Sequence, residues 1–375
     1  IKKMSMGTEF LMKKNKIDVF MGQARFISKN QLVVTDKEGN TQELSAKNII
    51  VATGAHTAMI PGVKVDREKI LTYQEAILQT RRPESVIIIG AGAIGAEFAT
   101  IWNSYGTKVT LVEMLPRILP LEDEEISAEL AKEFKKRGIR MLVGHKVLAV
   151  ETTDTGVNVK VSDGQNEVVL DAEQALIAIG FKPNTLDMGL ETAGIVLSER
   201  GFIQIDNRMA TNVPGLWAIG DVTGKLLLAH VASAMGVICA EQIAGVETVE
   251  LDYRMMPRAT FCHPQVASFG LTEAQAKEEG HEVKIGRFPF QPNGKALGLG
   301  DYAGWVKIIT DARYGEILGA HMIGPDVSEL LPELTLAQRS ELTIAEIARN
   351  VHSHPTLSEV IMEAAHSAEG HAIHI

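Results

Sequence analysis

The chain has 375 residues, of which 45% are hydrophobic and 22% are charged, and this predicts a folded protein of about two or three domains rather than a disordered one. Its 37 Lys and Arg against 47 Asp and Glu give a net charge of −10, which argues against a nucleic-acid-binding protein. No apolar run reaches about 18 residues, so we expect no membrane-spanning helix. The two cysteines, Cys239 and Cys262, exclude a disulfide framework, and the polar start predicts no signal peptide. Together they indicate a cytoplasmic protein.

The first part of the chain predicts a helix followed by strands. Residues Ile1 to Met12 read as the tail of a helix already under way, and the chain does not begin with Met. We therefore expect the front of a longer protein to precede Ile1. Residues Ile17 to Val34 alternate apolar and polar side chains, which is the period of half-buried strands. Lys47 to Thr53 predicts a short buried strand that ends at Gly54.

A second unit begins with the apolar run Val86 to Ile89, which is typical of a parallel strand buried on both faces. A helix is expected over Ile94 to Tyr105 and a strand over Lys108 to Val112. The pattern from Leu121 to Gly138 is helical, with an acidic first turn and a basic last turn that match the helix dipole.

The remaining elements alternate in the same way. Further strands are predicted over Val147–Thr152, Val157–Val161, Ala175–Ile179, Leu216–Ile219, Val283–Phe290 and Trp305–Thr310, and helices over Ala229–Ala244, Ser328–Leu342 and Leu357–Ala368. The character of the sequence shifts at about Leu251, where we expect a further domain.

A dinucleotide fingerprint lies between the first strand and helix of the second unit. Gly90, Gly92 and Gly95 form G-x-G-x-x-G, and Glu113 ends the next strand. In this setting the glycines permit a tight turn, an approach of the pyrophosphate to the backbone, and close packing of helix on strand. A carboxylate at Glu113 accepts hydrogen bonds from a ribose and repels a 2′-phosphate, so NAD is favoured over NADP. Glu97, one turn into the helix, is either a nucleotide contact or a plain helix residue.

Two further strand endings suggest a second nucleotide. Gly220-Asp221 follows the predicted strand Leu216 to Ile219. Thr53-Gly54-Ala55 follows the predicted strand Ile49 to Ala52. Each ending alone is a common turn. Because the two flank a complete dinucleotide unit, they could belong to one outer domain that the NAD unit interrupts.

The C-terminal histidines allow three interpretations. A metal site could use His352 and His354, but no carboxylate or Cys at ligand spacing completes it. His366, His371 and His374 fit ordinary surface histidines near a terminus. The third interpretation is an acid–base pair, in which Glu359, in the first turn of the next helix, reaches back to His354 and fixes its tautomer.

The collinear set of motifs resembles the flavin-dependent pyridine nucleotide–disulfide oxidoreductases from Phe10 to Ile375. The resemblance is carried by Val86–Glu113, Thr211–Asp221, Leu227–His230 and His354–Glu359. It implies an α/β fold with two Rossmann-like dinucleotide-binding domains, of which the FAD domain is incomplete and holds the NAD domain as an insertion, and an α+β C-terminal dimerisation domain. The domains expected are residues 1–84 and 206–250 for FAD, 85–205 for NAD and 251–375 for the interface.

The resemblance also implies cofactors and site residues. FAD is expected beside Ala24, Thr53, Gly54, Ala55, Asp221, Leu227, Leu228, Ala229 and His230, and NAD beside Gly90, Ala91, Gly92, Ala93, Ile94, Gly95, Ala96, Glu97, Glu113, Val147 and Gly180. His354 matches the family's acid–base histidine and Glu359 the carboxylate that orients it. No metal is expected. In the family this histidine works on the redox disulfide of the other subunit, which implies a homodimer.

The family's first G-x-G-x-x-G and its redox pair C-x-x-x-x-C are expected ahead of Ile1, and Cys239 and Cys262 do not have that spacing. Both are expected to be inert. Within the family, the branch that oxidises a protein-bound dihydrolipoyl dithiol with NAD⁺ fits best, with a lipoyl-bearing carrier protein of 2-oxo acid dehydrogenase complexes as partner. The alternatives are a soluble pyridine nucleotide transhydrogenase and a non-catalytic NAD-binding or dimerisation fragment. Glu113 argues against an NADPH reductase, and the tail lacks the Cys pair of mercuric-type reductases.

Overall fold

The structure, a computed structural model, describes residues 2–374, with the side chain of Lys2 left out. Ile1 and Ile375, which the expected outer domains include, lie outside the described residues. The chain forms two compact units, residues 2–56 with 182–251, and residues 57–181 with 252–374. It passes between them at β5 (Ala55–Thr57), at β14 (Phe181–Pro183) and between Leu251 and Asp252. Helices and strands are mixed in both, which confirms the α/β prediction. None of the helices within residues 2–374 is long and apolar enough to cross a membrane.

The first unit holds two small sheets and three α-helices. Its elements are α1 (Lys2–Lys14), β1 (Gln23–Ser28), β2 (Gln31–Thr35), β3 (Thr41–Ser45), β4 (Ile49–Val51), α5 (Leu190–Ala193), β15 (Leu216–Ala218), a short 3-10 helix at Gly220–Thr223, and α6 (Ala229–Ala244). Strands β1, β2 and β3 form an antiparallel sheet, and β4 pairs in parallel with β15. The helix expected over Ala229 to Ala244 is confirmed.

The strand expected to start at Ile17 begins instead at Gln23, which is paired with Thr35 of β2. Residues 17–22 are irregular, and the apolar side chains of Val19 and Met21 are 58% and 78% exposed. Alternating side chains supply one face for burial, but a strand also requires a neighbour that satisfies its backbone groups.

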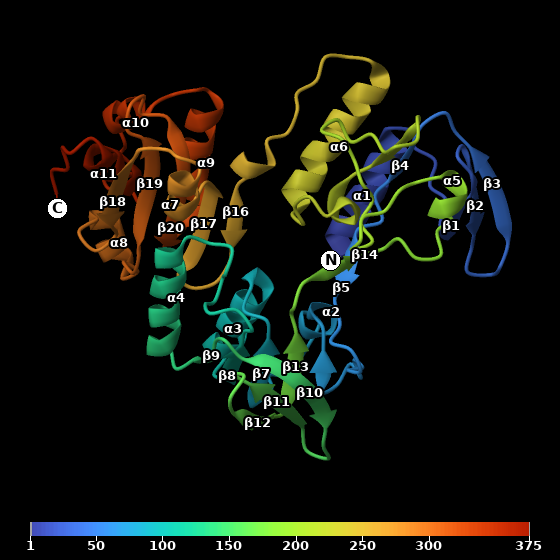
Figure 1. Ribbon diagram of the computed structural model, residues 1–375, viewed down its shortest axis with the longest axis horizontal. Helices are drawn as coiled ribbons and strands as arrows, with labels where there is room; N and C mark the ends of the chain where they lie inside the picture. Colours follow the sequence, from blue (N-terminus) through green and yellow to red (C-terminus); the bar gives the residue numbers. More distant parts are fainter. Residues whose placement is uncertain (1, 375) are drawn as a thin grey trace. The chain divides into compact units, whose positions relative to one another are not determined.

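The second unit begins with a parallel sheet of order β6-β13-β7-β8-β9 (Figure 1). Its elements are β6 (Ile70–Leu71), α2 (Tyr73–Ala76), β7 (Ser85–Ile89), α3 (Ala93–Ser104), β8 (Lys108–Val112), α4 (Glu124–Lys136), β9 (Arg140–Leu142) and β13 (Gln174–Ile177), with an antiparallel sheet of β10 (Lys146–Thr152), β11 (Val157–Ser162) and β12 (Glu167–Ala172) inserted before β13. The apolar run Val86 to Ile89 is buried, as predicted for a central parallel strand.

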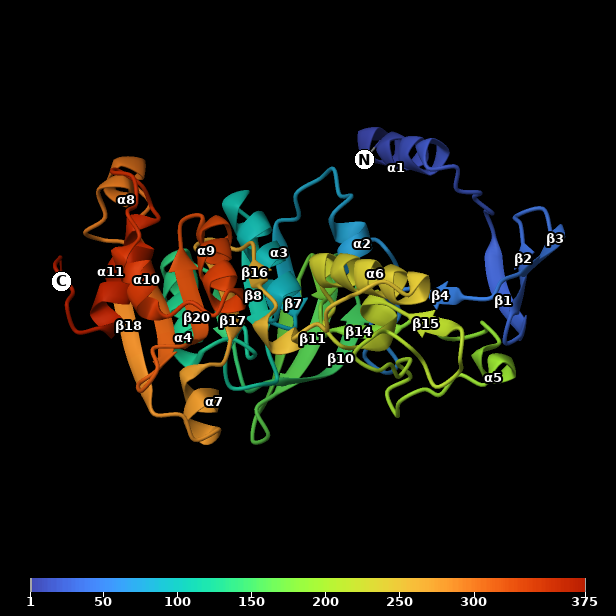
Figure 2. The same cartoon turned by 90° about the horizontal axis from the view of Figure 1, so that it is seen from above.

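The rest of the second unit is a five-stranded antiparallel sheet of order β16-β17-β20-β19-β18. Its elements are a 3-10 turn at Tyr253–Met255, β16 (Arg258–Thr260), β17 (Gln265–Gly270), α7 (Glu273–Glu278), β18 (Val283–Pro289), α8 (Gly294–Leu299), β19 (Trp305–Asp311), β20 (Ile317–Gly324), α9 (Val327–Arg339), α10 (Ile344–Arg349) and α11 (Glu359–Ala368). Figure 2 shows α9, α10 and α11 grouped beside this sheet, and a core that includes Phe269, Val306 and Ile361 fills the space between them. On the other face Val266 and Ile323 share a core with Phe98 and Trp102 of α3.

That other face carries a row of polar side chains across all five strands. The register pairs Arg258 with Ser268, Ser268 with His321, His321 with Lys307, and Lys307 with Arg287. Directly paired residues in an antiparallel sheet project to the same face. The row therefore presents charged and polar groups toward the start of α4.

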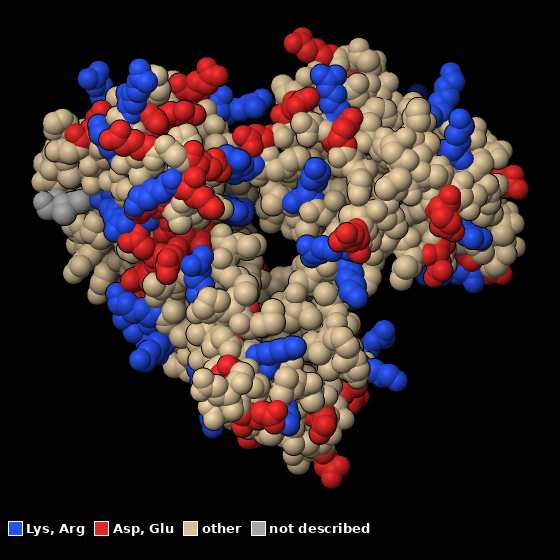
Figure 3. Space-filling view, viewed as in Figure 1, with Lys and Arg blue, Asp and Glu red and all other residues tan. Residues whose placement is uncertain are grey.

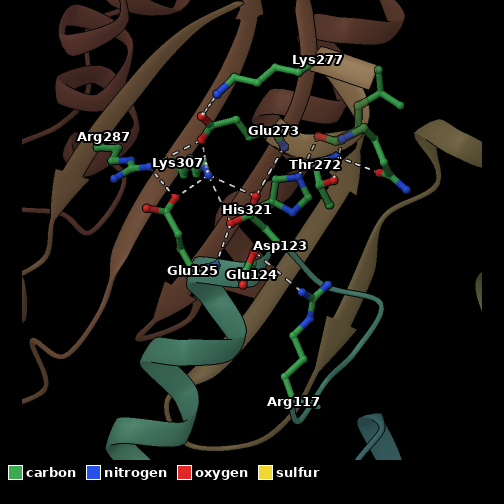
Figure 4. Close-up of polar contacts among 12 residues, drawn as sticks. Arg117, Asp123, Glu124, Glu125, Thr272, Glu273, Lys277, Arg287, Lys307 and His321 are labelled. Atoms are coloured by element: carbon green, nitrogen blue, oxygen red, sulfur yellow. Dashed lines mark hydrogen bonds and ion pairs between the residues drawn. The ribbon is translucent and has the colours of Figure 1, made fainter. Parts of the chain in front are cut away.

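Lys307 lies on β19, between His321 and Arg287 in this row, and its side chain is only 1% exposed. Figure 4 shows it among the surrounding carboxylates. Its ammonium group donates to Asp123 at 3.1 Å and to Glu125, and lies 2.8 Å from Glu273. Arg287 also pairs with Glu125. By contrast, acidic and basic side chains are interspersed over the outer face drawn in Figure 3. The buried Lys307 cluster joins α4 of the parallel sheet to the antiparallel sheet.

The cluster explains why α4 starts later than Leu121. The helix begins at Glu124, and Asp123 is its N-cap, with a side chain that accepts a hydrogen bond from the Glu125 N–H. Asp123 is 3% exposed, and although burial acts to raise its pKa, the nearby His321 and Lys307 hold that pKa below its ordinary value. The acidic first turn thus pairs with a buried cation as well as with the helix dipole.

Removal of the central cation should destabilise the second unit. We expect Lys307→Met to lower the free energy of unfolding by about 3–5 kcal/mol, because it leaves the buried carboxylate of Asp123 without its cation. The measurement is urea unfolding, with Lys284→Met, an exposed lysine on the adjacent β18, as the matched control. Equal unfolding midpoints for the two variants would contradict this account.

The cluster also predicts a pH dependence of stability. Hydrogen bonds from Lys277 and Lys307 lower the pKa of Glu273 from 4.5 to about 2. Because the folded state binds this proton less tightly than the unfolded state, the stabilisation is present above about pH 4.5 and is lost as the pH falls toward 2. Glu273→Gln should therefore lose less unfolding free energy than the wild type on acidification, measured by urea titrations between about pH 5 and 3. An identical loss in both proteins would show that Glu273 does not contribute.

Candidate active site

The loop between β7 and α3 is shaped by three glycines with different tasks. Gly90 has φ +101°, and a Cβ there would lie 2.3 Å from the carbonyl oxygen of Ala178. A Cβ on Gly95 would lie 1.9 Å from the carbonyl oxygen of Gly90, whereas a Cβ on Gly92 would meet nothing within 4 Å. The loop is therefore closed where it packs on the sheet and open at Gly92, as a backbone that receives a pyrophosphate must be.

Glu113 lies beside this loop, at the end of β8. Its carboxylate accepts the N–H of Ala91 at 2.7 Å and the N–H of Leu115 at 2.9 Å. A carboxylate has about four acceptor positions, so it can still accept from the hydroxyls of a ribose. The open backbone at Gly92 and this carboxylate fit an NAD molecule.

Two other expected NAD residues lie on neighbouring elements. Gly180 follows β13, the strand beside β7, and its carbonyl accepts the N–H of Ala58 at 2.8 Å. Val147 lies on β10 opposite Val161. The other loop and helix residues expected at this site, Ala91, Ala93, Ile94 and Ala96, lie between the glycines or in the first turn of α3.

The role of Glu97 on α3, which the sequence left undecided, is indicated by a hydrogen bond to another segment. Its carboxylate accepts the backbone N–H of Phe261 at 2.9 Å, and burial raises its pKa although this hydrogen bond acts to lower it. Thr100, one turn further, accepts the N–H of His263. This face of α3 is therefore bonded to the segment that leads into β17.

The expected FAD residues lie in the first unit, and two groups of them meet at one sheet edge. Strands β4 and β15 are parallel, so Thr53 and Asp221 follow strands that end at the same edge. Asn184 fixes the turn at Thr53. Its side-chain amide donates to the Thr53 carbonyl at 2.9 Å, and its backbone carbonyl accepts from the Thr53 hydroxyl at 2.8 Å. Asn184 is 131 residues away in sequence, and no motif indicated it.

Asp221 has the character of a ligand-binding carboxylate. It is partly buried, burial raises its pKa, and no donor among residues 2–374 is hydrogen-bonded to its carboxylate. A half-buried carboxylate with open acceptor positions fits a polyol such as the ribityl chain of FAD. Leu227, Leu228, Ala229 and His230 lead into the first turn of α6, whereas Ala24 lies on β1, in the other sheet.

His354 and Glu359, which the sequence predicts as an acid–base pair, are in contact. His354 Nδ1 lies 2.9 Å from Glu359 Oε1, and the N–H of Thr356 donates to Glu359 Oε2 at 2.8 Å. Although burial acts to raise the pKa of Glu359, the Thr356 N–H and His354 hold it below its ordinary value. An ionised carboxylate can only accept, so the proton of a neutral His354 resides on Nδ1 and the lone pair on Nε2. The His354 side chain is 77% exposed and open to a substrate.

The other histidines and the cysteines differ in environment. His352 is buried and bonded through both ring nitrogens. His374, expected as a plain surface residue, has its Nδ1 2.6 Å from the buried Glu363. Burial raises the pKa of Cys239 to about 11 and that of Cys262 to about 12, which agrees with the expectation that both are inert.

The glycine loop can be tested by two alanine substitutions with opposite consequences. We expect Gly95→Ala to cost about 1–3 kcal/mol of stability, because its methyl group meets the Gly90 carbonyl. Gly92→Ala should cost less than about 1 kcal/mol, since it alters only an N-cap, yet weaken NADH binding about tenfold or more by filling the open backbone. Urea unfolding and NADH fluorescence titration measure the two effects, and wild-type NADH affinity in Gly92→Ala would refute the proposed approach path.

Comparison with known proteins places these sites in a family. The pyridine nucleotide–disulphide oxidoreductase family matches residues 1–236, and the dimerisation domain of that family matches residues 256–365. The chain is 52% identical over 372 residues to a dihydrolipoyl dehydrogenase of Mycobacterium leprae, with 98% of this chain and 79% of the relative covered. It is 42% identical to the dihydrolipoyl dehydrogenase of Bacillus subtilis, with 100% and 81% covered.

Solved structures give the same result. LpdA from Mycobacterium tuberculosis superposes with a TM-score of 0.84 at 31% identity, covering 93% of this chain and 74% of that one. The HOCl-induced flavoprotein disulfide reductase RclA from Escherichia coli superposes with a TM-score of 0.85 at 27% identity, covering 96% and 83%. The chain belongs to the pyridine nucleotide–disulphide oxidoreductase family.

Proposed function

We propose that this protein is an enzyme that oxidises a protein-bound dihydrolipoyl dithiol with NAD⁺. The products are the lipoyl disulfide, NADH and one proton. Relatives at 42–52% identity over nearly the whole chain are named dihydrolipoyl dehydrogenase. The sequence resemblance that implies this reaction therefore agrees with the names of its relatives.

The single observation that carries the proposal is the 2.9 Å contact between His354 and Glu359. Oxidation of a dithiol releases protons, and a base beside the reacting sulfur makes the thiolate, which is the nucleophile. His354 offers Nε2 for that proton, and Glu359 stabilises the resulting imidazolium while it fixes the ring. We therefore assign His354 as the acid–base residue and Glu359 as the residue that orients it.

FAD and NAD are the cofactors, and each has a set of residues in this chain that fits it. FAD supplies the two-electron transfer between the disulfide chemistry and nicotinamide. We propose that Asp221, the Thr53–Ala55 turn, Ala24 and residues 227–230 hold the flavin. Gly90 to Glu97, with Glu113, Val147 and Gly180, would hold NAD, and the carboxylate of Glu113 disfavours a 2′-phosphate.

The proposed assembly is a homodimer, since residues 256–365 match a dimerisation domain. We propose residues 1–84 and 206–250 as the FAD part, 85–205 as the NAD part and 251–375 as the interface part. The proposed partner is a lipoyl-bearing carrier protein of a 2-oxo acid dehydrogenase complex. Because Cys239 and Cys262 are unpaired, we place the reaction in the reducing environment of the cytoplasm.

Substitution of the base should slow dithiol oxidation specifically. We expect His354→Gln to lower kcat with dihydrolipoamide and NAD⁺ by about 10²–10⁴-fold, with Glu359→Gln less severe and NAD⁺ affinity unchanged in both. The rate is followed by NADH absorbance. A wild-type rate in His354→Gln would reject its assignment, and hydride transfer between two nicotinamide nucleotides without dithiol turnover would favour a transhydrogenase instead.

A further inference from the structure

A second histidine–glutamate pair lies two residues before His354. His352 Nε2 is 3.0 Å from each carboxylate oxygen of Glu333, and His352 Nδ1 is 3.0 Å from the carbonyl oxygen of Asn350. The Asn350 amide also donates to Glu333 at 3.0 Å. The His352 side chain is 5% exposed, whereas the His354 side chain is 77% exposed, and the two glutamates are similar at 25% and 20%.

The partners of His352 determine its protonation. A backbone carbonyl and a carboxylate are both acceptors, and each can be bonded only by a ring nitrogen that carries a proton. A neutral imidazole has one N–H and would leave one of these contacts unmade. Both contacts of His352 are therefore satisfied only by the imidazolium form.

The pair ties together two parts of the interface domain. Glu333 lies on α9, which packs on β17 and β20. His352 and Asn350 belong to the segment between α10 and α11 that also carries His354 and leads into Glu359, the first residue of α11. The same segment is held at its other end by Asn293, whose amide donates to the Thr356 carbonyl at 2.9 Å.

We propose that His352, held as an imidazolium between Glu333 and the Asn350 carbonyl, is a positioning residue that fixes the loop bearing His354. The proposal rests on the function assigned above to His354. A charged hydrogen bond in a nearly buried site is stronger than a neutral one, and loss of the ring proton removes one anchor of the loop. A misplacement of about 1 Å can cost about 100-fold in rate.

The charges around His352 support the imidazolium. The hydrogen bond to Glu333 raises the pKa of His352 and outweighs the opposing effect of burial, and the nearby Glu359 of α11 acts in the same direction. In return, His352 is one of the groups that lower the pKa of Glu359.

The first test reads the protonation directly. In ¹⁵N-histidine NMR of the protein we expect both ring nitrogens of His352 to be protonated at neutral pH, with a titration above the ordinary value of about 6.5. Glu333→Gln keeps the size of the side chain but removes its charge, so the titration of His352 should move to lower pH. An unprotonated ring nitrogen at neutral pH in the wild type would overturn the proposal.

The second test links this protonation to catalysis in the FAD-loaded enzyme. We expect Glu333→Gln and His352→Gln to lower kcat with dihydrolipoamide about 10-fold to 100-fold, with KM for NAD⁺ unchanged. In Glu333→Gln the alkaline fall of kcat should move with the NMR titration of His352, which a purely structural role would not produce. His371→Gln, an exposed histidine outside the loop, is the matched control.

The two proposals fail in different ways. If His354→Gln keeps the wild-type rate, the function assigned to His354 is wrong. If His354→Gln is slow while Glu333→Gln keeps both its kcat and its alkaline limb, the assigned function stands and the positioning role of His352 is rejected. If His352→Gln does not fold, the kcat of Glu333→Gln and its alkaline limb decide whether His352 has the positioning role.

Discussion

The buried ammonium group of Lys307 is the interaction on which the second unit depends. The parallel sheet and the antiparallel sheet of that unit are separate hydrogen-bonded sheets, so no strand pairing joins them. They are joined by the core that Val266 and Ile323 share with α3 and by the pairing of Lys307 with Asp123 at the start of α4. Dispersion and apolar burial are non-directional, whereas a buried ion pair is satisfied in few geometries. Lys307 therefore constrains how the parallel sheet and the antiparallel sheet face one another.

The same unit holds both the glycine loop and the loop that bears His354. The glycine loop lies on the parallel sheet, and the loop with His354 lies beyond the antiparallel sheet, so both belong to one unit. Glu97 and Thr100 add hydrogen bonds from α3 to the backbone before β17. Helix α3, which begins at the glycine loop, is thereby bonded to the segment before β17 and also packs on β7 and β8. The glycine loop is therefore held by contacts with both sheets of the unit.

The sequence predicts those features that a short stretch of chain determines. Gly90, Gly92, Gly95 and Glu113 could be assigned because strand, turn and helix follow one another within 24 residues, and the structure brings Glu113 to the Ala91 N–H. The sequence could not predict contacts whose partners are set by tertiary packing: Lys307 with Asp123 is separated by 184 residues, and Asn184 with Thr53 by 131. The alternation at Ile17 to Gly22 led to a wrong strand prediction, because a strand requires a neighbouring strand to pair with as well as alternating side chains.

Burial separates the tasks of two histidines that the sequence presents as equivalent. His352 and His354 are two residues apart, and each pairs with a glutamate, yet the first side chain is 5% exposed and the second 77%. His352 meets acceptors at both ring nitrogens, which favours its imidazolium form. Among residues 2–374 His354 meets an acceptor at Nδ1 alone, which leaves its Nε2 open to a substrate. A base must be free to exchange its proton, and an anchor must not. The same residue type serves both tasks because the two sites differ in hydrogen-bond acceptors and in access to solvent.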